Sequence, residues 1–357
     1  MYEKFFKPRH TQIESMVSSV ELAKNSVVVS KLNKRQSENK PLDLLVSDVD
    51  GTIYINKGNR FYTGRNEETK AQIREKELPF ILNTGRPIWD ELEDQRVTEE
   101  IMLPAPDAVM AGTGTAIYWR QKNGELAIDE EYAKLLISQT ISFREAGELQ
   151  RSRFNPKLIV ELIRPELHPY ASSGQLSRIL VDEGPRLQDG TPGIEGLRLV
   201  MINIDYENLR KLIRAIHDRI EGLKIDFSEA SDNNKGQNFT GWVHIVPAMA
   251  GKDGAIKYVL TKLAEAMNLK NQKLDAHVVG DASNDLRVLA TGSNPEKEPY
   301  TLHQYGLGNL PNYTRTKLEN IDNSLSGAKN KPNRRAHISI LKEKGPDGVF
   351  KIVDSLS

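Results

Sequence analysis

Short apolar runs that end in turn-forming residues are the feature that most constrains what this chain can fold into. Four such runs are Leu42–Val46, Leu78–Leu82, Ala108–Met110 and Ala276–Val279, and Asp-Gly, Asn-Thr-Gly, Gly-Thr-Gly and Gly-Asp sequences follow them closely. The first two are separated by helical sequence over Arg65–Lys76. A short apolar run between turns is typical of a strand buried on both faces, and strands that alternate with helices predict βαβ units. The sequence therefore predicts an α/β fold with a doubly wound parallel sheet.

The segment between the third and fourth runs has a different pattern. It predicts helices over Glu131–Leu149 and Glu207–Leu223, and strands over Leu158–Ile163, Leu197–Ile204 and Phe239–Val246. This mixture indicates an α+β domain of about 130 residues inserted before the parallel sheet resumes. We therefore expect a core domain of residues 41–115 and 245–357 with an inserted domain of residues 116–244. Within the core, residues 291–345 read as mostly irregular surface and Val349–Leu356 as a last helix.

Residues 1–40 form a basic arm, with eight Lys and Arg against four Asp and Glu. Ile13, Met16, Val17, Val20 and Ala23 follow the spacing of one helix face. The pattern predicts one amphipathic helix, then a short apolar stretch and a polar linker over residues 33–40. Packing against the core is the favoured interpretation, and a contact with a partner or a second copy is the alternative.

Composition excludes several classes of protein. The chain has no cysteine, which rules out disulfides, thiolate zinc sites and a cysteine nucleophile. With 49 basic and 49 acidic residues it has no net charge that would attract nucleic acid or anionic lipid. Residues 1–30 lack the apolar segment of a signal peptide, and no apolar run is long enough to span a membrane. We expect a soluble cytoplasmic protein, a monomer or homodimer, without nucleic-acid or membrane partners.

Two aspartates follow the first apolar run directly, in the segment Asp48 to Thr52. Ligands of an open parallel sheet bind beyond the carboxyl ends of its strands, so Asp48 and Asp50 can converge on one centre there. Burying two carboxylates without a counter-charge is costly, and a hard cation such as Mg²⁺ removes the conflict. An Asp-Gly turn with an incidental aspartate is the alternative.

Three further elements strengthen the first interpretation. Asn83 to Arg86 follows the second run and supplies a hydroxyl and backbone N–H groups suited to phosphoryl oxygens. Lys252 opens a predicted helix, where its ammonium adds to the positive end of the helix dipole. Gly280 to Asp285 follows another run and adds acid at the same edge. Each element alone is weak, but their order at strand ends and helix starts points to a site for a phosphoryl group and a metal.

These are the four motifs of the haloacid dehalogenase superfamily, and the chain resembles its phosphatases. The motifs are Asp48 to Thr52, a second ending at Thr84, Lys252, and Gly280-Asp281 with Asn284-Asp285. The 168 positions between Thr84 and Lys252 match the branch with a large cap between motifs two and three. Within that branch the chain is most similar to sucrose-phosphate phosphatase and Cof-type sugar phosphatases. The resemblance implies a Rossmann-like core, a cap formed by the inserted domain, and hydrolysis of a small phosphomonoester, such as a sugar phosphate.

The resemblance also implies catalytic and metal-binding roles. Asp48 would be the nucleophile that forms an aspartyl-phosphate, and Asp50 the general acid and base. Mg²⁺ would be held by the Asp48 carboxylate, the carbonyl oxygen of Asp50 and Asp281.

The remaining motif residues are implied to hold phosphate. Thr84, Gly85, Lys252 and Asn284 would contact its oxygens, while Asp285 would orient the lysine or metal-bound water behind them. The cap carries no substrate motif that we can match. Transfer to another acceptor, as in mutases of the superfamily, and a receiver module phosphorylated on aspartate are the alternative functions.

Histidine and tryptophan offer no rival site in the sequence. His277 lies in an apolar run and is predicted to pack in the core. His244 lies on the predicted strand that leads from the inserted domain back to the core, and its side chain could face either layer. Trp89, Trp119 and Trp242 are predicted to serve core or hinge packing.

Overall fold

The computed structural model describes residues 17–56, 61–86, 103–182, 184–194, 196–229, 238–270, 272–282, 285, 297–311, 314–320 and 337–356. The predicted residues Ile13, Met16, Trp89 and Asn284 lie outside these ranges.

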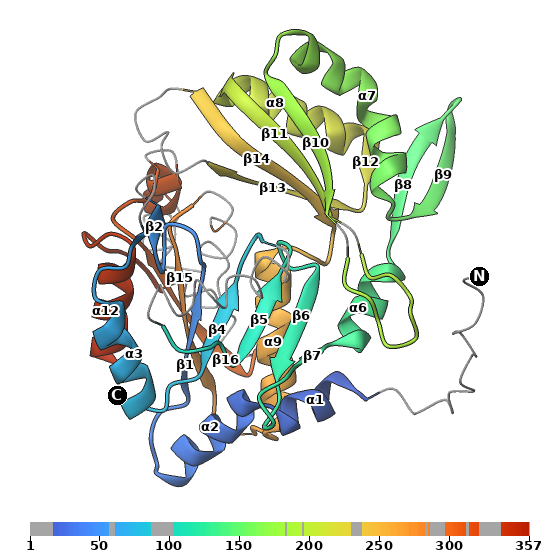
Figure 1. Ribbon diagram of the computed structural model, residues 1–357. Helices are drawn as coiled ribbons and strands as arrows, with labels where there is room; N and C mark the ends of the chain where they lie inside the picture. Colours follow the sequence, from blue (N-terminus) through green and yellow to red (C-terminus); the bar gives the residue numbers. More distant parts are fainter. Residues whose placement is uncertain are drawn as a thin grey trace, which may run out of the picture.

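An eight-stranded sheet forms the core domain (Figure 1). In spatial order its strands are β17 (His337–Ile340), β16 (Tyr300–Gly306), β15 (Leu274–Gly280), β1 (Asp43–Ser47), β4 (Phe80–Asn83), β5 (Ala108–Ala111), β6 (Ala116–Arg120) and β7 (Leu126–Ile128). From β17 to β5 all neighbours pair in parallel, and β6 and β7 add an antiparallel edge. The order reverses between β15 and β1, which makes their carboxyl ends the topological switch point.

Helices cover both faces of this sheet, which confirms the doubly wound prediction. The helices α3 (Asn66–Glu75) and α12 (Pro346–Ser355) pack together on one face. Their buried residues join one apolar cluster with Leu45 and Leu82. On the other face lies α9 (Lys252–Ala266), whose apolar residues pack with Leu44 and Val46. Successive strand residues point to opposite faces, so an uninterrupted apolar strand fills both layers.

The described part of the arm is an integral layer of the core. It forms α1 (Ser19–Asn25) and α2 (Val27–Ser37), with the side chain of Ser26 capping the second helix. The predicted linker over residues 33–40 is therefore wrong, because α2 continues to Ser37. Arg35 lies fully buried and donates to the carbonyl oxygens of Pro41 and Lys76 and to Asp43. A buried cation persists only with such partners, and this contact fastens the arm under β1.

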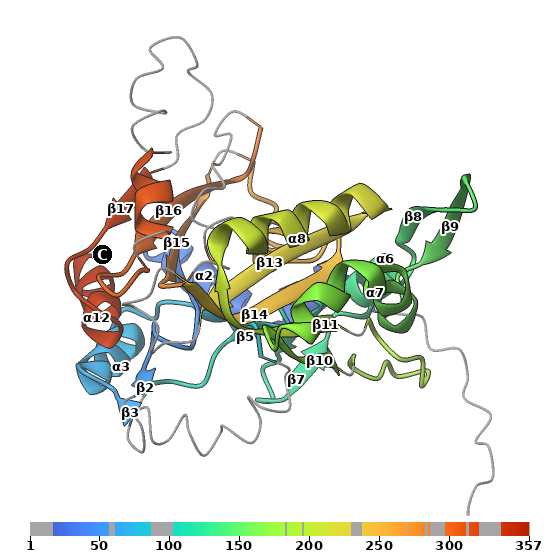
Figure 2. The same ribbon diagram turned by 90° about the horizontal axis from the view of Figure 1, so that it is seen from above.

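The inserted domain is built on two antiparallel sheets. The larger has the order β10 (Leu176–Asp182), β11 (Gly196–Asp205), β14 (Asn238–Pro247), β13 (Leu223–Glu229), and the smaller has the order β12 (Ile220–Glu221), β8 (Thr140–Glu145), β9 (Glu148–Arg153). Two helices, α7 (Pro156–Ser172) and α8 (Tyr206–Arg219), lie across the larger sheet (Figure 2). The opposite face of that sheet turns toward the core domain (Figure 1). We call this larger sheet the cap sheet.

The strands after residue 116 do not begin the inserted domain. β6 and β7 pair with the core sheet and are followed by α6 (Glu130–Ile137), so the strands of the insertion start at β8. With that shift, the division into arm, core and cap is our proposal for the domain organisation.

Two predictions in the insertion are wrong. Leu158–Ile163 is not a strand but the first half of α7, where Asn155 caps the helix and Ile159 and Ile163 are buried one turn apart. A short continuous apolar run does not distinguish a strand from a buried helix. The predicted helix Glu131–Leu149 ends at Ile137, and β8 and β9 follow as a hairpin.

The polar segment after the fourth run also holds more structure than predicted. β16 and β17 lie within residues 291–345 and extend the core sheet. The last helix was placed correctly, since α12 covers most of Val349–Leu356. Among the described residues, no helix combines the length and the apolar character needed to cross a lipid bilayer.

Candidate active site

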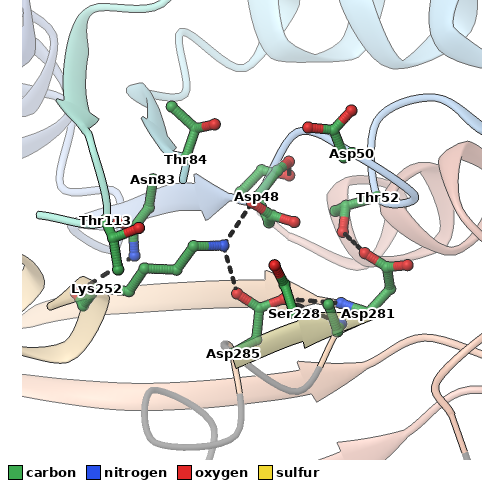
Figure 3. A network of polar contacts seen from close by, with 12 residues as sticks. Asp48, Asp50, Thr52, Asn83, Thr84, Thr113, Ser228, Lys252, Asp281 and Asp285 are labelled. Carbon is green, nitrogen blue, oxygen red and sulfur yellow. Dashed lines mark hydrogen bonds and ion pairs between the residues drawn. The ribbon is translucent and has the colours of Figure 1, made fainter. Parts of the chain in front are cut away.

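The four motifs meet at the carboxyl edge of the core sheet. Asp48 follows β1, Asp281 follows the adjacent strand β15, Thr84 follows β4, and Lys252 is the first residue of α9. Figure 3 shows these side chains around one centre. The sequence-based prediction that residues far apart in the chain converge here is confirmed by this geometry.

Three carboxylates form a compact, buried cluster, which we call the acidic cluster: Asp48, Asp281 and Asp285. One oxygen of each lies within 4.8 Å of the others. Asp48 is only 6 % exposed, Asp281 9 % and Asp285 3 %. The Nζ of Lys252 donates to Asp48 Oδ1 at 2.6 Å and to Asp285 Oδ1 at 2.7 Å. The lysine thus bridges the first motif and the fourth.

The acidic cluster holds more negative than positive charge. When ionised, three carboxylates and one ammonium leave two negative charges in a buried space. Burial raises the pKa of Asp48 to about 7 against the opposing effect of Lys252, and burial together with Asp48 raises the pKa of Asp281. Burial alone would lower the pKa of Lys252, but Asp285 and Asp48 outweigh it and raise that pKa. An all-oxygen donor set with this surplus charge fits a hard divalent cation.

Asp281 is aimed by contacts that the sequence analysis missed. Thr52 Oγ1 donates to its Oδ1 at 2.8 Å, and Asn309 Nδ2 donates to its Oδ2 at 2.7 Å. Asn309 is itself held because the backbone N–H of Gly345 donates to its Oδ1 at 2.9 Å. Gly51 leaves room for this arrangement, since a Cβ there would lie 2.0 Å from Asp281 Oδ2 and the residue has a φ of +77°. No pattern in the polar segment 291–345 marks Asn309 as part of a site.

Asp285 was expected behind the phosphate-binding residues, but it lies in the acidic cluster itself. Its Oδ2 accepts from the backbone N–H groups of Asp281 and Ala282 at 3.1 Å, while its Oδ1 accepts from Lys252. It therefore closes the turn after β15 and also belongs to the acidic cluster.

Asp50 lies near the acidic cluster but its carboxylate is engaged elsewhere. Arg86 Nε donates to its Oδ2 at 2.7 Å and Arg86 Nη2 to its Oδ1 at 2.5 Å. The hydroxyl of Tyr54 also donates to Oδ1, at 2.7 Å. The side chain of Asp50 is 55 % exposed. The sequence analysis gave Arg86 no role, yet this bidentate pair determines where the Asp50 carboxylate points.

The second motif is more closed than predicted. The Thr84 N–H donates to the carbonyl oxygen of Met110, and the Arg86 N–H donates to Thr84 Oγ1 at 3.1 Å. Two of the expected N–H donors are therefore already used, one by strand β5 and one within the loop. The Thr84 carbonyl oxygen accepts from the N–H of Thr113, which ties the loop after β4 to the loop after β5. Gly85 lies in this same turn.

We expect the metal-free protein to lose thermal stability as the pH rises from 5.5 to 8. The folded pKa of Asp48 is about 7, above its ordinary 3.8, and that of Asp281 is raised too. Between pH 3.8 and about 7, Asp48 holds a proton in the folded chain that it has released in the unfolded chain. This stabilisation is therefore complete below about pH 4 and lost as the pH rises through 7. Melting curves in EDTA should fall by several degrees across this range. A flat profile in EDTA, or an equal fall with MgCl₂, would contradict the interpretation.

Comparisons with known proteins agree with this geometry. Residues 41–146 match the family sucrose-6F-phosphate phosphohydrolase. A mannosylfructose-phosphate phosphatase of Agrobacterium fabrum is 33 % identical over 85 residues, which are 24 % of this chain. The chain thus spans about a third of the length of this curated relative, 32 %.

A solved structure with a TM-score of 0.50 shares this fold. The sucrose-phosphatase of Synechocystis sp. PCC6803, in complex with sucrose and phosphate, has a TM-score of 0.50 at 13 % identity, covering 88 % of this chain and 97 % of that one. A HAD/Cof-like hydrolase of Plasmodium vivax has a TM-score of 0.49 at 14 % identity, covering 92 % and 98 %. By its fold and the order of its motifs, the chain is similar to phosphatases of the haloacid dehalogenase superfamily. The matching family model and the curated relative are both named as phosphatases of sugar phosphates.

Proposed function

We propose that this chain is a Mg²⁺-dependent phosphomonoester hydrolase that acts on a sugar phosphate. The observation that supports it most is the buried acidic cluster, where a carboxylate suited to attack, Asp48, lies 2.6 Å from the ammonium of Lys252. Phosphoryl transfer needs mainly positioning and neutralised charge, which such a site supplies. The matches to sucrose-6F-phosphate phosphohydrolase and to a mannosylfructose-phosphate phosphatase support a sugar as the alcohol part.

The reaction would take two steps. A carboxylate oxygen of Asp48 attacks phosphorus and forms an aspartyl-phosphate, while the bond from phosphorus to the sugar oxygen breaks and Asp50 gives that oxygen a proton. Asp50 then takes a proton from water, whose oxygen attacks phosphorus, so that inorganic phosphate leaves and Asp48 is restored. For this cycle the Asp50 carboxylate must turn from Arg86 toward the acidic cluster.

The other site residues would bind and orient the substrate. Lys252 and the hydroxyl of Thr84 would hold phosphoryl oxygens, with Gly85 and Asn284 as further contacts. The carboxylates of Asp48 and Asp281, with the carbonyl oxygen of Asp50, would hold Mg²⁺, with Asp285 beside them. When bound, the ion would neutralise the charge that builds up on the phosphoryl group.

Phosphate release from a panel of phosphomonoesters tests this proposal. The panel holds hexose phosphates, disaccharide phosphates including sucrose 6F-phosphate, phosphoglycerates and nucleotides, each with MgCl₂ or with EDTA. We expect release from at least one sugar phosphate at a kcat/KM well above the other classes, and loss of release in EDTA. Release that is unchanged by EDTA would rule out the metal requirement. Consumption of substrate without inorganic phosphate, with a new sugar phosphate formed, would show a transferase instead.

A further inference from the structure

The two faces of the cap sheet differ in what covers them. On β14, Val243 and Ile245 are fully buried on the face that α7 and α8 cover, and they alternate with Trp242 and His244. Because side chains along a strand alternate, Trp242 and His244 lie on the face that turns toward the core domain (Figure 1). That face overlies the edge of the core sheet that carries the motifs.

Strand register arranges this face in rows across the cap sheet. In one row Arg198, His244 and Asp226 are partners on β11, β14 and β13. His244 and Asp226 are each 5 % exposed, so these two members of the row are closed off between the domains. In the next row Val200, Trp242 and Ser228 are partners, and none of these three residues is fully buried. We call this second row the cap row.

Trp242 is the unusual member of the cap row. Its side chain is 36 % exposed although it lies on an inward-turned face, whereas Trp119 in the core sheet is fully buried. Trp242 therefore does not lie in the fully buried core as Trp119 does, and hinge packing stays a prediction. The fold thus leaves about a third of Trp242 uncovered on the face that turns toward the core domain.

A chain of polar contacts ties the cap row to the catalytic loops. His244 Nε2 lies 3.3 Å from Ser228 Oγ, and His244 Nδ1 lies 3.1 Å from Thr113 Oγ1. Thr113 in turn donates its N–H to the carbonyl oxygen of Thr84. Figure 3 draws Ser228 in the same network as Asp281 and Asp285. The charge of Lys252 also acts on His244, which burial keeps neutral with a pKa of about 3.

We propose that the cap row Val200–Trp242–Ser228 is the subsite for the sugar ring of the substrate, a deepening that rests on the proposed function. The indole of Trp242 presents an apolar face to the C–H face of the ring, and Ser228 exchanges a hydrogen bond with a ring hydroxyl. His244 is a positioning residue, since it orients the Ser228 hydroxyl and fixes it against the loop of Thr113. With the phosphoryl group on the acidic cluster, the ring then extends along the cap sheet.

Turnover of a ringed and a ringless substrate tests the subsite. Trp242→Ala should lower kcat/KM for the best sugar phosphate of the panel by about tenfold, the usual value of one aromatic stacking contact. Acetyl phosphate, which has no ring, should be hydrolysed within twofold of wild type. Trp242→Phe should restore most of the sugar-phosphate activity, because a flat aromatic face returns. Leu149→Ala, a change at a 56 % exposed residue on β9, is the matched surface control and should affect neither substrate.

Each outcome decides between the claims. Equal losses on both substrates, or no loss on either, would overturn the subsite while leaving the hydrolase proposal intact. A Trp242→Phe variant as poor as Trp242→Ala would also overturn it. Wild-type protein that releases phosphate from neither substrate would overturn the proposed function, and the subsite with it.

Discussion

Asp48→Asn should abolish phosphate release and at the same time raise the thermal stability of the metal-free protein at neutral pH. An amide oxygen does not replace a carboxylate as nucleophile, so we expect turnover to fall by at least about 10⁴-fold. Stability should rise because the pKa of Asp48 is already raised to about 7 by burial, which means that its charge is disfavoured. Lys252 keeps Asp285 as its partner at 2.7 Å in the variant. Removal of one carboxylate charge thus lowers activity and raises stability.

Single-turnover assays and melting curves in EDTA measure both effects. Asp275→Asn is the control, because this aspartate lies at the other end of β15, half-exposed and paired with His303. It should leave phosphate release within about twofold and stability nearly unchanged. Residual turnover of Asp48→Asn above one per cent would remove Asp48 as the nucleophile. A variant that melts lower than wild type in EDTA would contradict the electrostatic account of the acidic cluster.

The part of the site that the sequence predicted depends on one geometric rule. Parallel strands end at a common edge, so residues that follow β1, β4 and β15 meet whatever their distance in the chain. That rule placed Asp48, Thr84 and Asp281 correctly at one edge. It says nothing about which way a side chain turns, and so the pairing of Asp50 with Arg86 came only from the structure.

What the sequence missed has physical reasons of three kinds. Asn309 acts through side-chain hydrogen bonds from an irregular segment, which leave no periodic pattern in the sequence. Trp242 sits on a strand with a clear alternation, but the alternation does not tell which face a second domain covers. Leu158–Ile163 failed for a third reason, since the cap at Asn155 and the packing of α7 override an apolar run that also suits a strand.

Lys252→Met should destabilise the metal-free protein more than any other single change at the site. Lys252 is 1 % exposed and is the ammonium bound to both Asp48 and Asp285. Methionine fills a similar volume but leaves two buried carboxylates without that charge, a loss of about 3–5 kcal/mol in comparable buried pairs. The loss should shrink as the pH falls, because the carboxylates then take up protons. MgCl₂ should also recover part of it, although phosphate release should stay abolished.

Urea unfolding at pH 5.5 and 8, with and without MgCl₂, separates this explanation from a packing defect. Lys262→Met on the same helix is the control, because its Nζ pairs with Glu131 and Glu265 near the surface. Such surface pairs contribute about 0–1 kcal/mol, and their loss depends little on Mg²⁺. Lys252→Met could instead lower the free energy of unfolding equally at both pH values, with no recovery in MgCl₂. The shape of the lysine side chain, rather than its charge, would then explain its contribution to stability. The acidic cluster would then not be an electrostatic unit, and the argument for a cation there would lose its support.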